Sequence, residues 1–229
     1  MPNIIEVENL RKVYGEFTLT DISFALPRGY IMGLIGPNGA GKSTIIKLIM
    51  NLVKRDEGKI NIFGLDSIGH EVDVKQRIGF VYDDNHFYEE LTVEQMKKVI
   101  APFYNNWDAG LFHKYLKQFE ISPKKKIKEL SKGMKTKFSL AFALSHHAEL
   151  IIMDEPTSGL DPVFRNEILE ILADLLQDEN KGVIFSTHIT SDLDKIADYI
   201  TFINKGKLVF SKTKDEILDN YAVVKGTKE

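Results

Sequence analysis

Cysteine is absent from the sequence, which excludes disulfide bonds and thiolate metal sites and suits a reducing compartment. An excess of positive charge is also absent: the net charge is -3, so the composition gives no reason to expect a nucleic-acid partner. No apolar run approaches the roughly 18 residues that a membrane-spanning helix requires, and the N-terminus lacks the pattern of a signal peptide. Any role at a membrane is therefore expected to depend on a partner protein.

What the sequence does contain is an ordinary globular composition, with 43% hydrophobic and 28% charged residues among 229. This length suits one large domain or a core with an inserted lobe. Strand-forming runs dominate residues 4–35 and return at 150–155, whereas residues 92–143 show helical periodicity. The aromatic residues expected to form the packing core of this helical lobe are Phe103, Tyr104, Trp107 and Phe112.

A glycine-rich turn, Gly36–Thr44, separates an apolar run that predicts a buried strand from a stretch that predicts a helix. Glycines let the backbone wrap closely around an anion, and the start of a helix directs unpaired N–H groups at it. In such a loop the lysine reaches the β- and γ-phosphates, the serine can bind Mg²⁺, and the threonine lies near the α-phosphate. The turn therefore predicts binding of a nucleoside triphosphate. Its candidate phosphate-binding residues are Asn38, Gly39, Ala40, Gly41, Lys42, Ser43 and Thr44.

Two carboxylates, Asp154 and Glu155, end a second apolar run that begins at Leu150. An aspartate in this position is typical of the residue that holds Mg²⁺ beside a phosphate loop. The adjacent glutamate is then placed to orient or deprotonate an attacking water. Acidic pairs at strand ends also cap helices, but the phosphate loop elsewhere in the chain favours the catalytic interpretation.

Strands alternate with helices along the chain, and polar residues follow the carboxyl ends of the strands. This order predicts an α/β fold with a mostly parallel sheet and a site at that edge. The expected architecture is a P-loop NTPase core with an N-terminal antiparallel β subdomain and an inserted α-helical lobe. Residues 1–83 and 149–229 would form the core with its β subdomain, and residues 84–148 would form the lobe.

From about residue 3 to residue 210 the chain resembles the nucleotide-binding subunit of an ABC transporter. The segments that carry the resemblance are Tyr14, Gly36–Thr44, Leu130–Met134, Asp154–Glu155, Ser158–Asp161 and His188. Leu130–Met134 is the most specific of them, because it is similar to the family's LSGGQ signature and opens a predicted helix. It departs from that signature at Lys132 and Met134. The resemblance implies a single ABC ATPase domain over residues 1–229.

The resemblance also implies that ATP is held between two subunits. Ser131 and Gly133 would contact the γ-phosphate of ATP that is bound by the partner's phosphate loop. Asp161, a plausible helix N-cap, would couple the two sites. Tyr14 would stack on adenine, although its residue type alone favours ordinary packing at the edge of a sheet.

Three residues would act in hydrolysis according to the resemblance. Lys42 and Glu155 keep the roles described above, and His188 would contact the γ-phosphate and sense hydrolysis. Asp83 stands where the family usually has a glutamine that touches Mg²⁺ and the attacking water. It could still bind Mg²⁺ or water through an oxygen, but it is shorter, charged and unable to donate a hydrogen bond. We therefore expect preserved hydrolysis with altered coupling or metal dependence.

Residues 85–90 fall where the family receives the coupling helix of its membrane subunit. Exposed aromatic side chains there would suit docking, but Phe87 and Tyr88 could equally pack on the helical lobe. A cluster of lysines at residues 124–137 surrounds the signature. It is interpreted as a solvated face, with attraction to anionic lipid or to the partner's phosphates as the alternative.

The combined interpretation is an ATP-hydrolysing subunit that powers transport across a membrane through a separate transmembrane permease. It would use Mg²⁺ and dimerise with a second copy or a homologous ATPase subunit, at the cytoplasmic face of the cell membrane and without nucleic acid. The Lys-Gly-Met signature and the short tail after Tyr221 favour an exporter. The alternative is a soluble ABC ATPase acting on ribosomes or DNA; such relatives usually have two domains or long coiled coils, which this sequence lacks.

Overall fold

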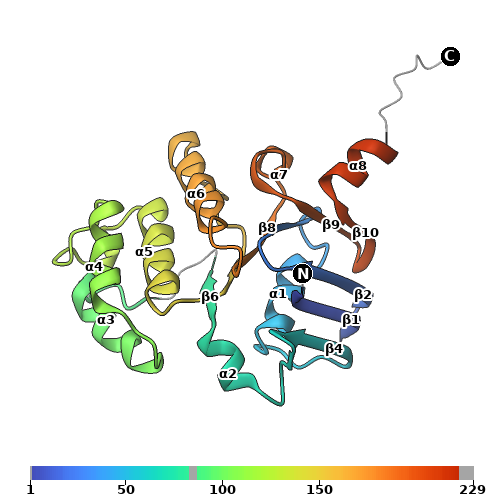
Figure 1. The fold of residues 1–229 in the computed structure, drawn as a ribbon, viewed down its shortest axis with the longest axis horizontal. Helices are drawn as coiled ribbons and strands as arrows, with labels where there is room; N and C mark the ends of the chain where they lie inside the picture. The colour runs from blue at the N-terminus through green and yellow to red at the C-terminus, as the bar shows by residue number, and fades with distance from the viewer. Residues whose placement is uncertain (1, 83–86, 222–229) are drawn as a thin grey trace.

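The computed structural model describes residues 2–82 and 87–221. Within these residues ten strands join in one sheet, in the order β5-β4-β1-β2-β10-β9-β3-β8-β7-β6 (Figure 1). The strands are β1 (Asn3–Tyr14), β2 (Phe17–Pro27), β3 (Ile31–Ile35), β4 (Glu57–Ile62), β5 (Leu65–Asp66), β6 (Ile78–Val81), β7 (Leu150–Met153), β8 (Gly182–Thr187), β9 (Tyr199–Asn204) and β10 (Lys207–Thr213). The helices are α1 (Lys42–Ile49), α2 (Glu71–Gln76), α3 (Val93–Ile100), η1 (Ala101–Phe103), α4 (Ala109–Gln118), η2 (Ile127–Glu129), α5 (Lys132–Ser145), α6 (Pro162–Leu175), α7 (Thr190–Ile196) and α8 (Lys214–Asn220).

Five neighbouring strands, β9, β3, β8, β7 and β6, run parallel to one another. Ile31 of β3 lies opposite Val183 of β8, and Ile78 of β6 lies opposite Leu150 of β7. β7 and β8 are buried along their whole length, as expected of parallel strands that are covered on both faces. The predicted α/β fold, with a core sheet that is mostly parallel, is confirmed.

Antiparallel strands extend the sheet beyond this core. β1 pairs with β2 and with β4, and β4 pairs with β5. β9 and β10 form the hairpin that the sequence predicts around Lys205 and Gly206. A parallel pairing of Lys207 with Thr20 joins this hairpin to β2. The antiparallel strands near the N-terminus therefore lie beside the parallel core, as predicted.

Helices α3, α4 and α5 lie together at one end of the molecule (Figure 1). Phe112 of α4 and Phe138 of α5 are fully buried there, and the ring of Trp107 lies 5.3 Å from that of Phe112. The expectation that Phe103 belongs to this packing core is wrong, since its side chain is 72% exposed. Phe103 ends the short 3-10 turn η1 between α3 and α4, outside the helix faces that bury the other rings.

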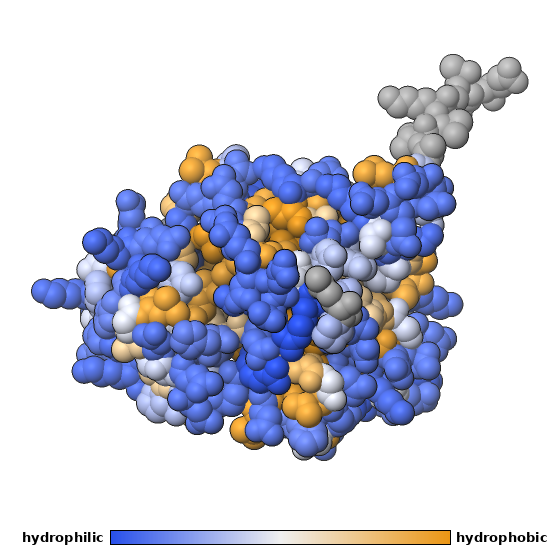
Figure 2. All heavy atoms as spheres, viewed as in Figure 1, coloured by the Kyte–Doolittle hydropathy of each residue, from blue (hydrophilic) through white to orange (hydrophobic). Residues whose placement is uncertain are grey.

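Most large apolar side chains are buried in two clusters, one around Phe138 and Phe185 and another around Ile45 and Ile184. Because Ile184 and Phe185 are neighbours on β8, these clusters lie on opposite faces of the sheet. The face drawn in Figure 2 is largely hydrophilic, with hydrophobic side chains gathered in smaller areas. Among the residues that the structure describes, no helix has the length and apolar character needed to cross a membrane.

The parallel core brings the carboxyl ends of three strands to one edge of the sheet. β3 leads into the phosphate loop, β7 leads into Asp154 and Glu155, and β8 leads into His188. Residues that are more than 100 positions apart in the sequence therefore meet at this edge. The fold places the candidate site there, as the sequence predicts.

Candidate active site

The phosphate loop connects β3 to α1. Gly39 and Gly41 have φ angles of 76° and 116°, in a backbone region that favours glycine. A Cβ atom on Gly41 would lie 2.9 Å from Leu19 Cδ1 and 3.2 Å from Phe17 Cζ, so a larger residue there would displace these side chains. Gly41 is the N-cap of α1 and has no side chain to cap the helix. An anion can take that role by accepting hydrogen bonds from the first N–H groups.

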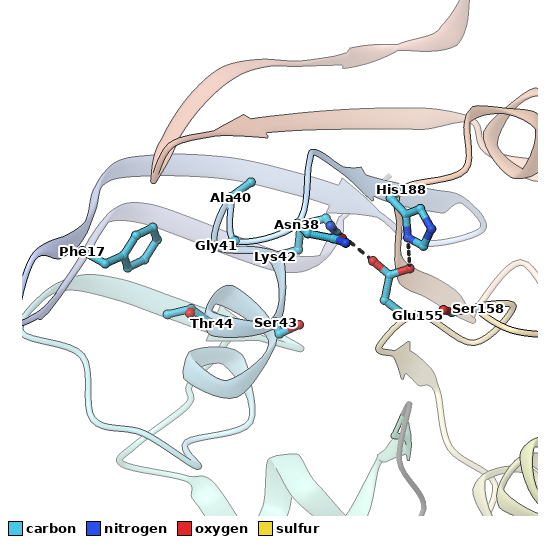
Figure 3. A pocket seen from close by; sticks show the side chains of 11 residues that line it. Phe17, Asn38, Ala40, Gly41, Lys42, Ser43, Thr44, Glu155, Ser158 and His188 are labelled. Atoms are coloured by element: carbon cyan, nitrogen blue, oxygen red, sulfur yellow. Dashed lines mark hydrogen bonds and ion pairs between the residues drawn. The ribbon is translucent and has the colours of Figure 1, made fainter.

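A cavity of about 610 Å³ lies over this loop (Figure 3). Its lining residues are Phe17, Asn38, Gly39, Ala40, Gly41, Lys42, Ser43, Thr44, Glu155, Ser158 and His188. Every candidate phosphate-binding residue of the loop lines the cavity, together with two of the residues predicted to act in hydrolysis. A volume of this size is typical of a small-molecule site.

Glu155 joins the phosphate loop to His188 (Figure 3). Its Oε1 lies 3.2 Å from Lys42 Nζ, and its Oε2 lies 2.8 Å from His188 Nδ1. Lys42 Nζ also donates a hydrogen bond to the carbonyl oxygen of Gly36 at 2.8 Å. Glu155 therefore contacts both of the other side chains predicted to act in hydrolysis, Lys42 and His188.

Asp154 contacts the phosphate loop from the end of β7. Its Oδ1 accepts hydrogen bonds from Ser43 Oγ at 3.0 Å and from Ser186 Oγ at 2.6 Å. A hydroxyl and a carboxylate are the hard oxygen ligands that Mg²⁺ prefers, and this ion needs few protein ligands beside phosphate and water. Among the described residues no group of three or more carboxylate, histidine or cysteine side chains is close enough to hold a metal alone. The donor set therefore fits an Mg²⁺ ion that binds together with phosphates.

The backbone of Glu155 adopts a left-handed conformation with a φ angle of 47°, which is uncommon for any residue except glycine. Its N–H donates to Ser186 Oγ at 2.9 Å, and its carbonyl oxygen accepts from the N–H of Ser158 at 3.1 Å. Such conformations persist where the surrounding structure holds them, and they are frequent at active sites. The Ser186 hydroxyl therefore contacts both acidic residues: the side chain of Asp154 and the backbone N–H of Glu155.

The aromatic residue at the cavity is one that the sequence analysis missed. Phe17 lines the cavity, whereas Tyr14 does not, and the Tyr14 side chain is 40% exposed. The two residues lie opposite each other across the β1–β2 hairpin, so their side chains share a face. The short spacing between these aromatics, across Gly15, was the sequence signal that could have identified Phe17.

The signature and Asp161 lie away from the cavity of their own chain. Ser131 is the N-cap of α5 and accepts a hydrogen bond from the N–H of Met134 at 3.3 Å. Asp161 is the N-cap of α6, as predicted, and accepts from two N–H groups at 3.0 and 3.2 Å. Both residues begin a helix, and neither contacts the phosphate loop. Asp83, the remaining candidate, lies outside the described residues.

Gly133 packs the signature helix against α6. A Cβ atom on Gly133 would lie 2.9 Å from Cδ1 and 3.0 Å from Cγ of the Phe164 ring. One turn further along α5, Lys137 Nζ lies 2.5 Å from Glu167 Oε2 and 5.0 Å from the centre of the same ring. The signature is therefore joined to the helix that follows Asp161.

We compared the chain with protein families and with known proteins. Residues 19–158 match the family described as ABC transporter, and residues 124–193 also match one described as "AAA domain, putative AbiEii toxin, Type IV TA system". The linearmycin resistance ATP-binding protein LnrL of Bacillus subtilis (strain 168) is 36% identical, over 93% of this chain and 70% of its own. The lantibiotic transport ATP-binding protein SrtF of Streptococcus pyogenes is 32% identical, over 93% of this chain and 92% of its own.

A solved structure of an ATP-binding subunit of an ABC transporter superposes with a TM-score of 0.85. It is 29% identical in sequence and covers 94% of this chain and 92% of its own. The match to the ABC transporter family spans more than half of the chain and includes the phosphate loop, the signature and both carboxylates. The chain therefore belongs to the ABC transporter family, as a nucleotide-binding domain that hydrolyses ATP.

Proposed function

We propose that the chain hydrolyses ATP to drive export across a membrane through a separate transmembrane permease. The observation that carries this proposal is the position of the Glu155 carboxylate, between Lys42 and His188 at the cavity of the phosphate loop. A base in that position can reach a water beside a γ-phosphate that Lys42 holds. LnrL is named for linearmycin resistance and SrtF for lantibiotic transport. Both names support the export direction.

The phosphate loop would bind the nucleotide. The N–H groups of residues 38–44 and the ammonium of Lys42 would contact the phosphates. Ser43 and Asp154 would hold Mg²⁺, with Asp83 as a further candidate ligand. When bound, the ion would neutralise charge on the β- and γ-phosphates.

Glu155 would orient the attacking water and accept its proton. His188 Nδ1 donates a hydrogen bond to the Glu155 carboxylate, and His188 would contact the γ-phosphate when nucleotide is bound. Both side chains follow the carboxyl ends of buried strands, which position their backbone. Catalysis would consist mainly of positioning and electrostatic stabilisation.

We further propose that the active unit is a dimer. Ser131, Gly133 and Asp161 do not line the cavity of their own chain, although the family resemblance assigns them to nucleotide binding and coupling. A second subunit that presents its α5 N-terminus to the phosphate loop would bring Ser131 to the γ-phosphate. The dimer would contain two such sites, each built from both chains.

The proposed docking site for the permease is an apolar groove of about 390 Å³. It is lined by Met50, Leu52, Lys75, Phe80, Tyr82, Phe87, Met96, Ile100, Tyr104, Ser139 and Phe142. Phe87 packs into the lobe, with its ring 5.0 Å from that of Phe138, whereas Tyr88 is 67% exposed. Of the two aromatics left open by the sequence, Phe87 thus lines the proposed docking groove, whereas Tyr88 is exposed and does not line it. Residues 84–148 would form the lobe on one side of this groove.

Affinity purification of the tagged chain from gently solubilised membranes of its own organism tests the proposal. We expect mass spectrometry to identify a multi-span membrane protein as the main partner, which would place the chain on the inner face of the cell membrane. Purified complex should then hydrolyse Mg-ATP. Recovery of ribosomal proteins or DNA-bound factors instead would contradict the transport function and favour the soluble alternative.

A further inference from the structure

Asp192, in the first turn of α7, is a carboxylate with no exposed surface. Its Oδ2 accepts a hydrogen bond from Thr157 Oγ1 at 2.7 Å and a longer one from Thr187 Oγ1 at 3.4 Å. Its Oδ1 accepts from Arg165 Nε at 2.6 Å. One buried carboxylate therefore binds three side chains that come from different parts of the chain.

Each of these three partners belongs to a segment that carries a proposed functional residue. Thr157 lies two residues after Glu155, and Thr187 immediately precedes His188. Arg165 is on the first turns of α6, four residues after Asp161. The Asp192 carboxylate is thus the common anchor of the segments that follow β7, end β8 and begin α6.

Burial of the Asp192 carboxylate has a cost in free energy that the packing of α7 on α6 does not require. A buried carboxylate is expensive unless it is paired and hydrogen-bonded, and loss of its partner leaves an uncompensated charge. A simpler link already joins the surfaces of α6 and α7, because Lys195 Nζ of α7 donates to Asn166 Oδ1 of α6 at 2.6 Å. Packing α7 on α6 therefore does not by itself account for the buried carboxylate.

The segment after β7 has a particular need for such an anchor. Glu155 keeps a left-handed backbone conformation that the chain must hold in place. Its side chain must also meet both Lys42 and His188. Thr157, which is 1% exposed, ties this turn to Asp192, and Thr187 ties the residue before His188 to the same carboxylate.

We propose that Asp192 is a positioning residue for hydrolysis. Through Thr157 and Thr187 it holds Glu155 and His188 at fixed positions relative to each other. Arg165 balances its charge. The inference rests on the proposed function, because it concerns the same site. Asp192 does not line the cavity and would not touch the nucleotide. Its effect should therefore be on turnover and not on nucleotide binding.

The test replaces Thr157 by Val, which removes the hydroxyl at nearly unchanged volume. We expect kcat for ATP to fall by about 10- to 100-fold, since a displacement near 1 Å in an active site can cost that much. KM for ATP and the affinity for ADP should stay within about twofold, because the phosphate loop is untouched. Thr157→Ser keeps the hydroxyl and should retain most of the wild-type kcat. Lys195→Ala, which breaks the surface link between the same helices, should leave kcat unchanged.

Asp192→Asn supplies a second variant, with thermal unfolding measured for every protein. If Thr157→Val folds and turns over ATP like wild type, or if Thr157→Ser loses as much activity, the positioning role is wrong. A parallel loss of ADP affinity and thermal stability would also overturn it in favour of a purely structural role. A wild-type protein that fails to hydrolyse Mg-ATP would remove the proposed function, and the inference with it. Normal wild-type turnover with unaffected variants would remove the inference alone.

Discussion

The ammonium group of Lys42 lies 3.2 Å from Oε1 of Glu155, and the two side chains are only 5% and 14% exposed. The residue proposed to bind the phosphates is therefore paired with the residue proposed to activate water. An incoming phosphate must replace the carboxylate as the partner of Lys42. We therefore expect Glu155 to compete with nucleotide for Lys42 in the free site.

Removal of this competing charge should strengthen the binding of ADP. We expect Glu155→Gln to bind ADP roughly two- to fivefold more tightly, because the charged carboxylate no longer competes with phosphate for Lys42. Isothermal titration calorimetry measures the difference without interference from hydrolysis. Glu170→Gln, on the exposed side of α6, is the matched control and should bind ADP as wild type does. Unchanged or weaker binding by Glu155→Gln would show that the ion pair does not compete with nucleotide.

Hydrolysis should respond to the same substitution in the opposite direction. A glutamine cannot accept the proton of the attacking water, so we expect turnover to fall by about 10²- to 10⁴-fold while ATP remains bound. Phosphate release under multiple-turnover conditions measures the loss, and ATP retention on a filter measures binding. Retained turnover would exclude Glu155 as the base.

The adenine contact can be separated from the phosphate contacts. We expect Tyr14→Ala and Phe17→Ala each to weaken ATP binding by roughly threefold to tenfold, since an aromatic stacking contact is worth about 0.5–1.5 kcal/mol. Binding of inorganic tripolyphosphate, which has no base, should be unchanged in Tyr14→Ala. Tyr88→Ala, an exposed aromatic in another part of the molecule, is the control. Equal losses for ATP and tripolyphosphate would argue against stacking.

Replacement of Gly133 by alanine should destabilise the fold even though alanine is the better helix former. The new methyl group would lie 2.9 Å from Phe164 Cδ1, so α5 and α6 would have to move apart. We expect a loss of about 1–3 kcal/mol in the free energy of unfolding, measured with urea. The double variant Gly133→Ala with Phe164→Leu should recover part of the loss. If the double variant is no more stable than the single one, the ring is not the cause.

Glu149 should make the free energy of unfolding depend on pH in the acidic range. Hydrogen bonds from Arg77, at 2.5 and 2.9 Å, and then from Arg28 hold the pKa of its carboxyl below the ordinary value of 4.5, against the opposing effect of burial. Because the folded-state pKa is the lower one, this contribution is complete above pH 4.5 and is lost as pH falls through the folded-state pKa.

The measurement is urea unfolding of wild type and Glu149→Gln between pH 3 and pH 7. We expect the variant to be about 1–2 kcal/mol less stable at pH 7, a modest value because the carboxylate is partly exposed, and to differ less at pH 3. Glu179→Gln, an exposed acid, should follow wild type throughout. A difference that is the same at every pH would mean that the carboxylate charge is not the source of the stability.

The aromatic residues show where prediction from the sequence succeeded and where it failed. Phe112 was correctly placed in the packing core of the helices because helical periodicity determines which residues share a face. Phe103 was placed there wrongly, because a 3-10 turn interrupts that periodicity. Phe17 was missed because its place at the cavity depends on the register of a hairpin and on how closely Gly41 of the phosphate loop approaches β2.

The sequence by itself determined the phosphate loop, the strand-end carboxylates and the α/β architecture. The loop and the carboxylates are each carried by a short contiguous stretch, and the architecture follows from the order in which strands alternate with helices, so residue types and spacing are enough to predict them. Only the tertiary structure decided that Glu155 lies between Lys42 and His188, that Gly133 faces Phe164 and that Asp192 anchors three segments. These contacts join residues far apart in the chain, and their distances follow from strand order and helix packing, which no local pattern specifies.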